Sequence, residues 1–156
     1  MQNSLSKTLE RDLRRVVGDD WVLTEPERLL AYESDGLTAY RMLPGAVVLP
    51  KDTDEVSRVL GLLSEADVAA VPRGAGTGLS GGALAAGSSV VIGTARMKRI
   101  LEIDPENRIA LVQPGVVNAD LSAAAAPFGL YYAPDPSSQS ACTLGGNVAE
   151  NSGGPH

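Results

Sequence analysis

A glycine-rich segment at residues 71–82 constrains this chain more than any other feature of its sequence. The segment reads Val-Pro-Arg-Gly-Ala-Gly-Thr-Gly-Leu-Ser-Gly-Gly, and it directly follows an apolar run. Glycines at alternate positions allow positive φ angles, and they expose successive backbone N–H groups that can form a concave nest for an anion. Arg73 adds a positive charge, and Thr77 and Ser80 add hydroxyl donors. The pattern favours a phosphate-binding loop, with a pyrophosphate as its natural guest, over a flexible surface loop.

Short apolar runs around this loop predict buried strands. The runs cover residues 46–49, 68–71 and 89–92, and their continuous apolar character is typical of strands buried on both faces. Between the first two runs, Asp52 or Thr53 can cap a helix. The apolar side of that helix consists of Val56, Val59, Leu60 and Leu63. Strand, helix and strand form a βαβ unit, so we expect parallel strands and a right-handed crossover.

The sequence motifs of two better-known glycine loops match part of this segment but lack other features that each motif requires. Residues 76–81 match the G-x-G-x-x-G fingerprint of Rossmann folds, which requires a helix to open at the loop. Only residues 83–88 separate the loop from the next strand, which is too short for a crossover helix. The phosphate loop of nucleotide hydrolases requires Lys and then Ser or Thr, where this chain has Gly82 and Ala83. Neither type is predicted here.

The N-terminal part predicts two helices that pack outside the sheet. Apolar residues recur at helical spacing over residues 5–16, and Gly18 is a suitable stop. Thr24 and Glu27 form a capping-box pattern that opens a second, shorter helix.

Beyond residue 98 the pattern becomes antiparallel. Residues 100–103 and 109–112 are strand-like and are joined by an Asp-Pro-Glu-Asn turn sequence, which predicts a hairpin. Asn118 can cap a helix that stops near Gly129, and the remainder is loop-rich. We therefore expect an α+β protein with a helical segment (1–42), a parallel βαβ part (43–97) and a mainly antiparallel part (98–156).

Composition limits the classes of function. The formal net charge is −6, which argues against a nucleic-acid-binding chain, because such chains normally carry a basic face. The single cysteine, Cys142, allows neither an intrachain disulfide nor a cysteine-based metal site, and we expect no metal. The N-terminal sequence lacks the apolar stretch of a secretory signal, and no run of apolar residues is long enough for a membrane span. These features make a cytoplasmic protein the expectation.

Four motifs, in this order, resemble the FAD-linked oxidases of the vanillyl-alcohol oxidase type. Residues 72–82 resemble the pyrophosphate loop of that family, and residues 113–116 (Gln-Pro-Gly-Val) its strand-to-helix turn. Residues 133–138 (Ala-Pro-Asp-Pro-Ser-Ser) resemble its second flavin-contacting stretch, and residues 141–156 its third. The resemblance extends from about residue 25 to the end of the chain, and within the family it is greatest to the group that contains glycolate oxidase and the D-lactate dehydrogenases. A single glycine loop is weak evidence, whereas four motifs in the family's order are specific.

The resemblance implies a PCMH-type FAD-binding fold. In that fold a small parallel βαβ subdomain precedes a mainly antiparallel α+β subdomain, which is incomplete in this chain, and FAD lies between them. It implies that loop amides wrap the pyrophosphate, that the second stretch lines the flavin, and that the third lies against the isoalloxazine ring and ribityl chain. The residues implied in cofactor binding are Arg73, Gly74, Ala75, Gly76, Thr77, Gly78, Ser80, Gly81, Pro134, Asp135, Ser138, Gly145, Gly146, Asn151, Ser152 and Gly153. Many relatives link flavin covalently through a histidine where this chain has Thr77, so non-covalent FAD is implied.

The resemblance also implies an activity, namely oxidation of a 2-hydroxy acid such as glycolate or D-lactate by hydride transfer to FAD. Family members continue into a substrate-binding cap domain that carries the catalytic base. We therefore expect the catalytic residues outside this chain, and we expect the chain alone to be inactive. No role as a base is predicted for His156, and Cys142 is expected to pack as a small side chain. Two alternatives stay open: a non-catalytic FAD-binding subunit that works with partner chains of an oxidase complex, and a nucleotide-phosphate-binding module without redox function.

Overall fold

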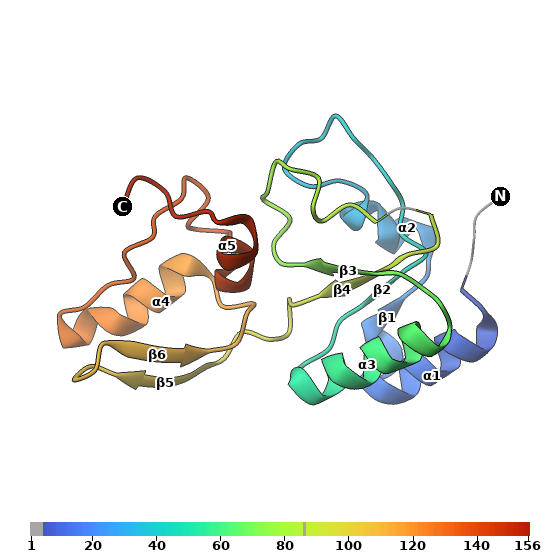
Figure 1. Cartoon of the computed structure of the whole chain (residues 1–156), viewed down its shortest axis with the longest axis horizontal. Coiled ribbons are helices and arrows are strands. Elements are labelled where there is room, and N and C mark those ends of the chain that lie inside the picture. The colour runs from blue at the N-terminus through green and yellow to red at the C-terminus, as the bar shows by residue number, and fades with distance from the viewer. Residues whose placement is uncertain (1–4, 86) are drawn as a thin grey trace. The chain divides into compact units, whose positions relative to one another are not determined.

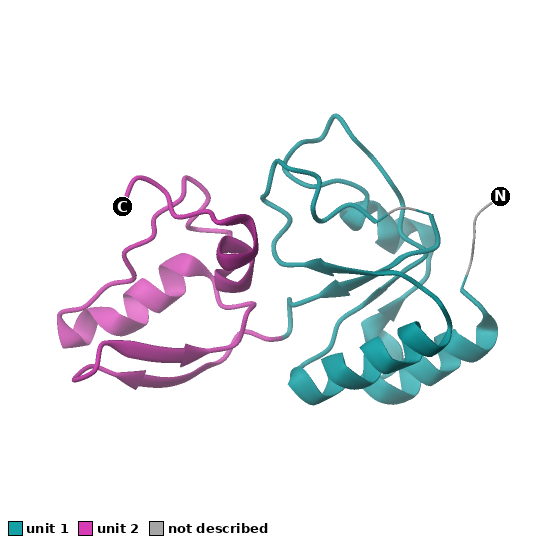
Figure 2. Ribbon diagram, viewed as in Figure 1, with its two compact units in different colours: residues 1–96 teal, residues 97–156 magenta. Residues whose placement is uncertain are grey.

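The computed structural model describes residues 5–85 and 87–156 (Figure 1). Residues 1–4 of the expected helical segment and residue 86 of the expected loop-to-strand connection lie outside the described residues. The chain divides into two compact units, residues 1–96 and 97–156, which Figure 2 shows in separate colours. The segments expected at 1–42 and 43–97 both fall in the first of these units, apart from Met97.

A four-stranded sheet with strand order β1-β2-β4-β3 forms the centre of the first unit. Its strands are β1 (Val22–Leu23), β2 (Ala46–Val48), β3 (Ala70–Arg73) and β4 (Val90–Gly93). β2 and β3 both run parallel to β4, and β1 runs antiparallel to β2. The predicted parallel strands are confirmed, with β4 placed between the two strands of the βαβ unit. β1 was not predicted, because a two-residue strand shows no periodicity.

Helices and loops cover both faces of this sheet. On one face the strands pack against α1 (Lys7–Val17) and α3 (Thr53–Glu65), and Leu13, Val59 and Leu63 are almost completely buried there. On the other face they pack against α2 (Pro26–Leu29) and the 3-10 helix η2 (Leu30–Tyr32). Successive side chains of a strand point to opposite faces, so each strand contributes to both cores. Burial on both faces explains why β2 and β4 contain no polar side chain, whereas the edge strand β3 is less buried and ends at Arg73.

The ends of the long helices follow local signals in the sequence. α1 ends at Gly18, which has a φ of 94°, and a short 3-10 helix, η1 (Asp19–Trp21), follows. Asp52 caps α3, and its side chain accepts a hydrogen bond from the Glu55 N–H at 2.9 Å. Both predicted boundaries are confirmed. The expected apolar side of α3 is wrong at one position, because Leu60 is 45% exposed.

Two further details of the first unit differ from the expectation. The capping box at Thr24 is wrong: Glu25 is the N-cap of α2 without a side-chain bond, because Pro26 opens the helix. The Thr24 hydroxyl lies instead 3.3 Å from an Arg14 guanidinium nitrogen. β3 begins two residues later than expected and continues through Pro72. Since β3 is an edge strand, a proline that cannot donate to the ladder is tolerated there.

The second unit contains the predicted hairpin, with β5 (Ile100–Asp104) antiparallel to β6 (Ile109–Val112). Its helices are α4 (Asn118–Ala125), the 3-10 helix η3 (Ala126–Phe128), and α5 (Leu144–Glu150). Val116, Leu121 and Leu144 form its core and pack against one side of the hairpin. η3 ends at Gly129, which has a φ of 70°, as expected.

Two expectations for the second unit are wrong. Asn118 does not cap α4: Val117 is the N-cap, and the fully buried Asn118 side chain donates to the Pro134 carbonyl at 2.8 Å. The expected loop after residue 141 contains α5, whose N-cap Thr143 accepts a hydrogen bond from the Gly146 N–H at 3.3 Å. The sequence did not predict this helix, because it contains Gly145 and Gly146 and glycine has a low helix propensity.

Within residues 5–85 and 87–156, no helix combines the length and the apolar character that crossing a membrane would require. The same residues contain no group of three or more His, Cys, Asp or Glu side chains that could hold a metal ion.

Candidate functional site

The glycine-rich segment leaves the carboxyl end of β3 and leads into β4. No helix occurs among the described residues of this connection, so the prediction that this is not a Rossmann loop is confirmed. The carboxyl ends of parallel strands are the usual position of ligands in such sheets. The loop therefore stands where a ligand site is expected.

Consecutive backbone N–H groups in this loop have no acceptor among the residues that the structure describes. In the part of the chain that the structure describes, no oxygen accepts a hydrogen bond from the N–H groups of residues 74–79. Residues 74 and 76–78 are nevertheless partly buried. Residues 75 and 79 are exposed, so these donors are available to an external acceptor as well as to water. A phosphate group, with several oxygens and a negative charge, supplies such acceptors.

The Arg73 side chain lies against this loop at Gly76. Its side chain is only 8% exposed, and its guanidinium carbon lies 5.5 Å from the centre of the Tyr32 ring. A Cβ atom added at Gly76 would lie 2.6 Å from that same carbon, which places the guanidinium directly against the loop backbone. Burial lowers the pKa of Arg73, and the nearby Tyr32 and Asp35 side chains oppose this shift. The guanidinium stays protonated, so a buried positive charge lies against the loop at Gly76.

One nitrogen of this guanidinium is also unpaired. Nη1 of Arg73 is buried and has no hydrogen-bond partner among the described residues. Sequence reasoning expected Arg73 to contribute a positive charge and its backbone amide, and the structure shows in addition that this cation is buried.

Positive φ angles occur at only two glycines of the expected binding loop, Gly76 (72°) and Gly81 (80°). Gly74 and Gly78 do not use the left-handed region. The Gly81 N–H also differs from those of residues 74–79, since it donates to the Asp35 carboxylate at 2.8 Å. Gly81 therefore shapes the loop, and its amide is already paired inside the protein.

The segment that contains Asp35 was missed by sequence reasoning. Gly36 donates its N–H to the Gly78 carbonyl at 2.9 Å, so residues 35–36 contact the loop at two points. An isolated Asp-Gly pair is typical of a turn, and nothing in the sequence indicates a partner more than 40 residues away.

The flavin-contacting stretches expected from the resemblance lie together within the second unit. Asp135 donates its N–H to the Gly153 carbonyl at 2.9 Å, and Gly145 donates to the Pro114 carbonyl at 2.9 Å. The Cys142 N–H donates to the Ser138 carbonyl at 2.7 Å. Residues 113–116, 133–138 and 141–156 are thus brought together, although they are distant in sequence.

Several of the expected flavin contacts in these stretches have structural roles. A Cβ at Gly145 would lie 2.7 Å from the Pro114 Cβ, so α5 can pack on that turn only without a side chain. The Gly146 N–H is bound to the Thr143 cap, and Asn151 ends α5 with a φ of 53°. The Ser152 N–H donates to the Asn147 carbonyl at 2.8 Å. Among these residues Gly153 differs, because a Cβ there would meet no atom within 4 Å.

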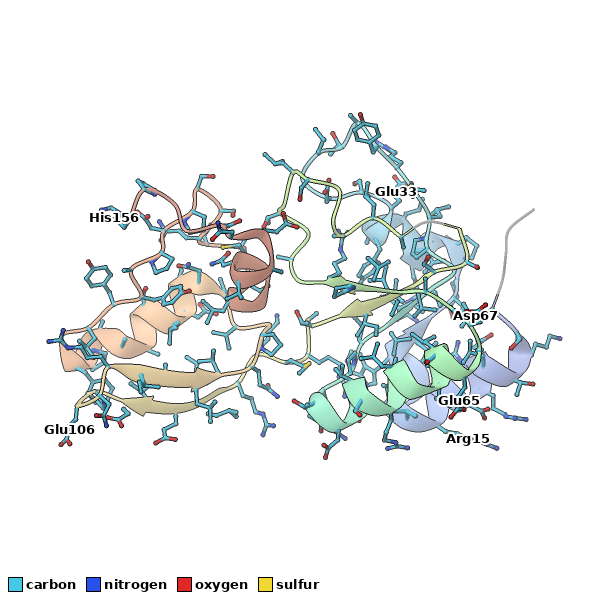
Figure 3. All side chains as sticks on the ribbon, in the orientation of Figure 1. Arg15, Glu33, Glu65, Asp67, Glu106 and His156 are labelled. Carbon is cyan, nitrogen blue, oxygen red and sulfur yellow. The ribbon has the colours of Figure 1, made fainter. Side chains whose placement is uncertain are left out.

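Two side chains that were expected to be inert have defined surroundings. Cys142 is buried, so the prediction that it is a packing residue is confirmed. His156, labelled in Figure 3, lies with its Nδ1 atom 2.7 Å from the Asp135 carboxylate. Hydrogen bonding from His156 lowers the pKa of Asp135. Both side chains are accessible to solvent, and the Pro134 carbonyl beside them is held by Asn118.

Comparison with known proteins agrees with this arrangement. The profile of one protein family, described as FAD binding domain, matches residues 44–156. The glycolate oxidase subunit GlcD of Escherichia coli K12 is 55% identical over 135 residues, which cover 86% of this chain and 27% of that protein. The D-lactate dehydrogenase of Anaerostipes hadrus is 43% identical over 111 residues, which cover 71% of this chain and 23% of that protein.

Solved structures share the fold. Alkyldihydroxyacetonephosphate synthase matches with a TM-score of 0.85 at 23% identity, over 94% of this chain and 29% of that one. At this identity the match shows the fold alone. The chain spans about a quarter to a third of the proteins that it matches.

Proposed function

The chain belongs to the FAD binding domain family of the vanillyl-alcohol oxidase type, and from this premise we propose that it is the FAD-binding portion of a flavoprotein oxidoreductase that oxidises a 2-hydroxy acid. Glycolate and D-lactate are the candidate substrates, because they are named in two relatives that this chain resembles. FAD is the cofactor of this domain. Since the chain spans only 27% and 23% of those relatives, the activity of a whole protein is an inference from them.

The unpaired N–H groups of residues 74–79 are the observation that carries this proposal. FAD contains a diphosphate, whose several negatively charged oxygens can accept hydrogen bonds from a row of backbone donors. The buried Arg73 guanidinium beside Gly76 has a nitrogen without a partner among the described residues, so the site also offers a positive charge. The residues present therefore fit the diphosphate of FAD.

We propose that FAD is held without a covalent link. Residues 74–82 contain no histidine, cysteine or tyrosine to which a flavin could be attached, and Thr77 has only a hydroxyl. When bound, FAD supplies the redox centre that accepts a hydride from the carbon bearing the substrate hydroxyl. This chain supplies binding and orientation. Residues 74–78 and Ser80 hold the diphosphate, and Gly76 and Gly81 give the loop its shape.

Residues of the second unit are proposed to contact the flavin portion. Pro134, Asp135, Ser138 and the stretch 151–153 lie in neighbouring segments of that unit, and Gly153 leaves open space beside its backbone. Gly145 and Gly146 are proposed to support this surface from α5, because their amides are already paired. We assign no catalytic base to this chain.

A second candidate function is a flavin-binding subunit that works with partner chains. The word subunit in the name of the glycolate oxidase relative favours it. Under this alternative the protein binds FAD in the same loop, but oxidises glycolate or D-lactate only when its partners are present. Reduction of bound FAD by either acid in the isolated flavoprotein, under anaerobic conditions, would contradict the alternative.

Flavins with two, one and no phosphate groups test the cofactor site. The purified protein is titrated with FAD, FMN and riboflavin, followed by flavin fluorescence, and with ADP by calorimetry. Hydrogen bonds to charged groups contribute about 1.5–3 kcal/mol each, so loss of the diphosphate should weaken binding by about 100-fold or more. ADP should compete with FAD.

Two outcomes would contradict the proposal. Riboflavin that binds as tightly as FAD would show that the glycine loop is not the anchor. A colourless protein that binds ADP but no flavin would indicate a nucleotide-phosphate module without redox function.

A further inference from the structure

Asp35 is a buried carboxylate whose partners are backbone amides. It is 6% exposed and makes no ion pair with any residue in the described ranges. Its Oδ1 atom accepts a hydrogen bond from the Leu37 N–H at 2.9 Å, and its Oδ2 atom accepts one from the Gly81 N–H at 2.8 Å. Charged side chains are seldom buried unless they are paired. The two amides hold the Asp35 carboxylate, and the buried Arg73 guanidinium, whose pKa the Asp35 charge raises against the lowering effect of burial, lies near enough to stabilise it electrostatically.

A second contact joins the same segment to the glycine loop. Gly36 donates its N–H to the Gly78 carbonyl at 2.9 Å. A Cβ at Gly36 would lie 2.7 Å from the Thr77 carbonyl oxygen and 2.9 Å from that of Gly78, so only glycine permits this approach. Residues 35–36 therefore hold the loop at residue 78 and again at residue 81.

The stretch of loop that these contacts involve includes the proposed phosphate-binding amides. N–H groups gathered in one place carry partial positive charges that repel one another, and no protein acceptor among the described residues balances those of residues 74–79. Gly76 and Gly81 also hold left-handed conformations. A loop of this kind keeps its shape only if neighbouring groups fix it, and Asp35 supplies the buried anion that does so.

We propose that Asp35 is a positioning residue of the phosphate site: its carboxylate and the adjoining Gly36 amide hold the loop in the conformation that presents the amides of residues 74–79 to a diphosphate. This inference rests on the proposed FAD site for the identity of the ligand, but the fixing of the loop by Asp35 does not depend on it. Asp35 does not touch the ligand in this scheme and acts through Gly81 and Gly78.

The substitution Asp35→Asn separates two opposite effects. Removing a negative charge near an anion site would by itself strengthen the binding of a phosphate. The asparagine side chain, however, offers one oxygen where Asp35 accepts from two amides, so one amide loses its partner and the loop loses a fixed point. We expect the second effect to dominate, because the loop contacts are direct, with an affinity for FAD lowered by about tenfold or more.

A matched control lies two residues away. Glu33, labelled in Figure 3, pairs with Arg41 at 2.9 Å, and none of its side-chain bonds reaches the described part of the glycine loop. Glu33→Gln removes the same charge from the same segment and should leave the affinity for FAD within about twofold of the original.

The experiment measures the affinities of the original protein, D35N and E33Q for both FAD and riboflavin. A positioning role predicts that D35N weakens FAD binding and leaves riboflavin binding unchanged, whereas general damage to the fold would weaken both. Equal or tighter FAD binding by D35N would overturn the inference. If the original protein binds no flavin, the proposed function fails instead, and the two failures are thus distinguishable.

Amide hydrogen exchange in the original, flavin-free protein provides a second measurement that does not require the variant to fold. The Gly81 amide should exchange markedly more slowly than the amides of residues 74–79. Gly81 donates to Asp35, whereas those six amides have no acceptor among the described residues. Exchange of the Gly81 amide as fast as that of residues 74–79 would overturn the inference.

Discussion

Replacing Gly76 by alanine tests the glycine loop at the point where the structure predicts the largest effect from the smallest change. Gly76 has a φ of 72°, a conformation that costs a residue with a Cβ about 1–2 kcal/mol. The added methyl group would also collide with the Arg73 guanidinium, whose carbon lies 2.6 Å from the Cβ position. Arg73 is buried against Tyr32 and cannot simply move into solvent. Overpacking of this kind costs about 1–3 kcal/mol.

Together these two effects should destabilise the loop conformation that binds phosphate by about 2–5 kcal/mol. Because each 1.4 kcal/mol is tenfold in affinity, FAD binding should weaken by about 30-fold at least. Gly87→Ala is the matched control, since Gly87 also has a positive φ, of 60°, but a Cβ there would meet nothing within 4 Å. Titration with FAD at fixed ionic strength measures both variants. If Gly76→Ala binds FAD as tightly as Gly87→Ala does, the reasoning about this loop is refuted.

Three further predictions concern stability and titration. Leu13→Ala should lower the free energy of unfolding by about 2–5 kcal/mol in urea titrations, because its side chain is completely buried between α1 and the sheet. Gly145→Val should also destabilise, by about 1–3 kcal/mol, since its Cβ would meet Pro114, and an unchanged unfolding midpoint would contradict this. His156→Ala should raise the pKa of Asp135 toward its ordinary value of 3.8, measured by NMR titration. Because the pKa of Asp135 is lowered in the folded protein, its contact with His156 contributes to stability above that ordinary value and is lost as the pH falls through the lowered pKa.

The elements that sequence reasoning predicted correctly are those with strong local signals. β2, α3 and β4 follow from continuous apolar runs and from the Asp52 cap, and the β5–β6 hairpin follows from its turn. The glycine loop that we propose as the diphosphate site is recognisable for the same reason, because its glycines are close together in sequence. These signals depend on near neighbours, which a sequence displays directly.

The errors arise where distant contacts decide the outcome. Asn118 resembles a helix cap, yet its side chain is drawn to the carbonyl of Pro134. α5 was hidden by Gly145 and Gly146, although the Thr143 cap three residues before Gly146 was a readable signal. Asp35 carries no local indication of its contact with Gly81, 46 residues away. A contact of this length becomes visible only when the fold is known.

The most direct test of the account follows individual backbone amides while FAD is added to the isotopically labelled protein. We predict that the largest changes in amide chemical shift, and the strongest gain in protection from hydrogen exchange, occur at residues 74–79, whose N–H groups lack acceptors within the described residues. Binding of FAD with no change at these amides would contradict the assignment of the glycine loop as the diphosphate site.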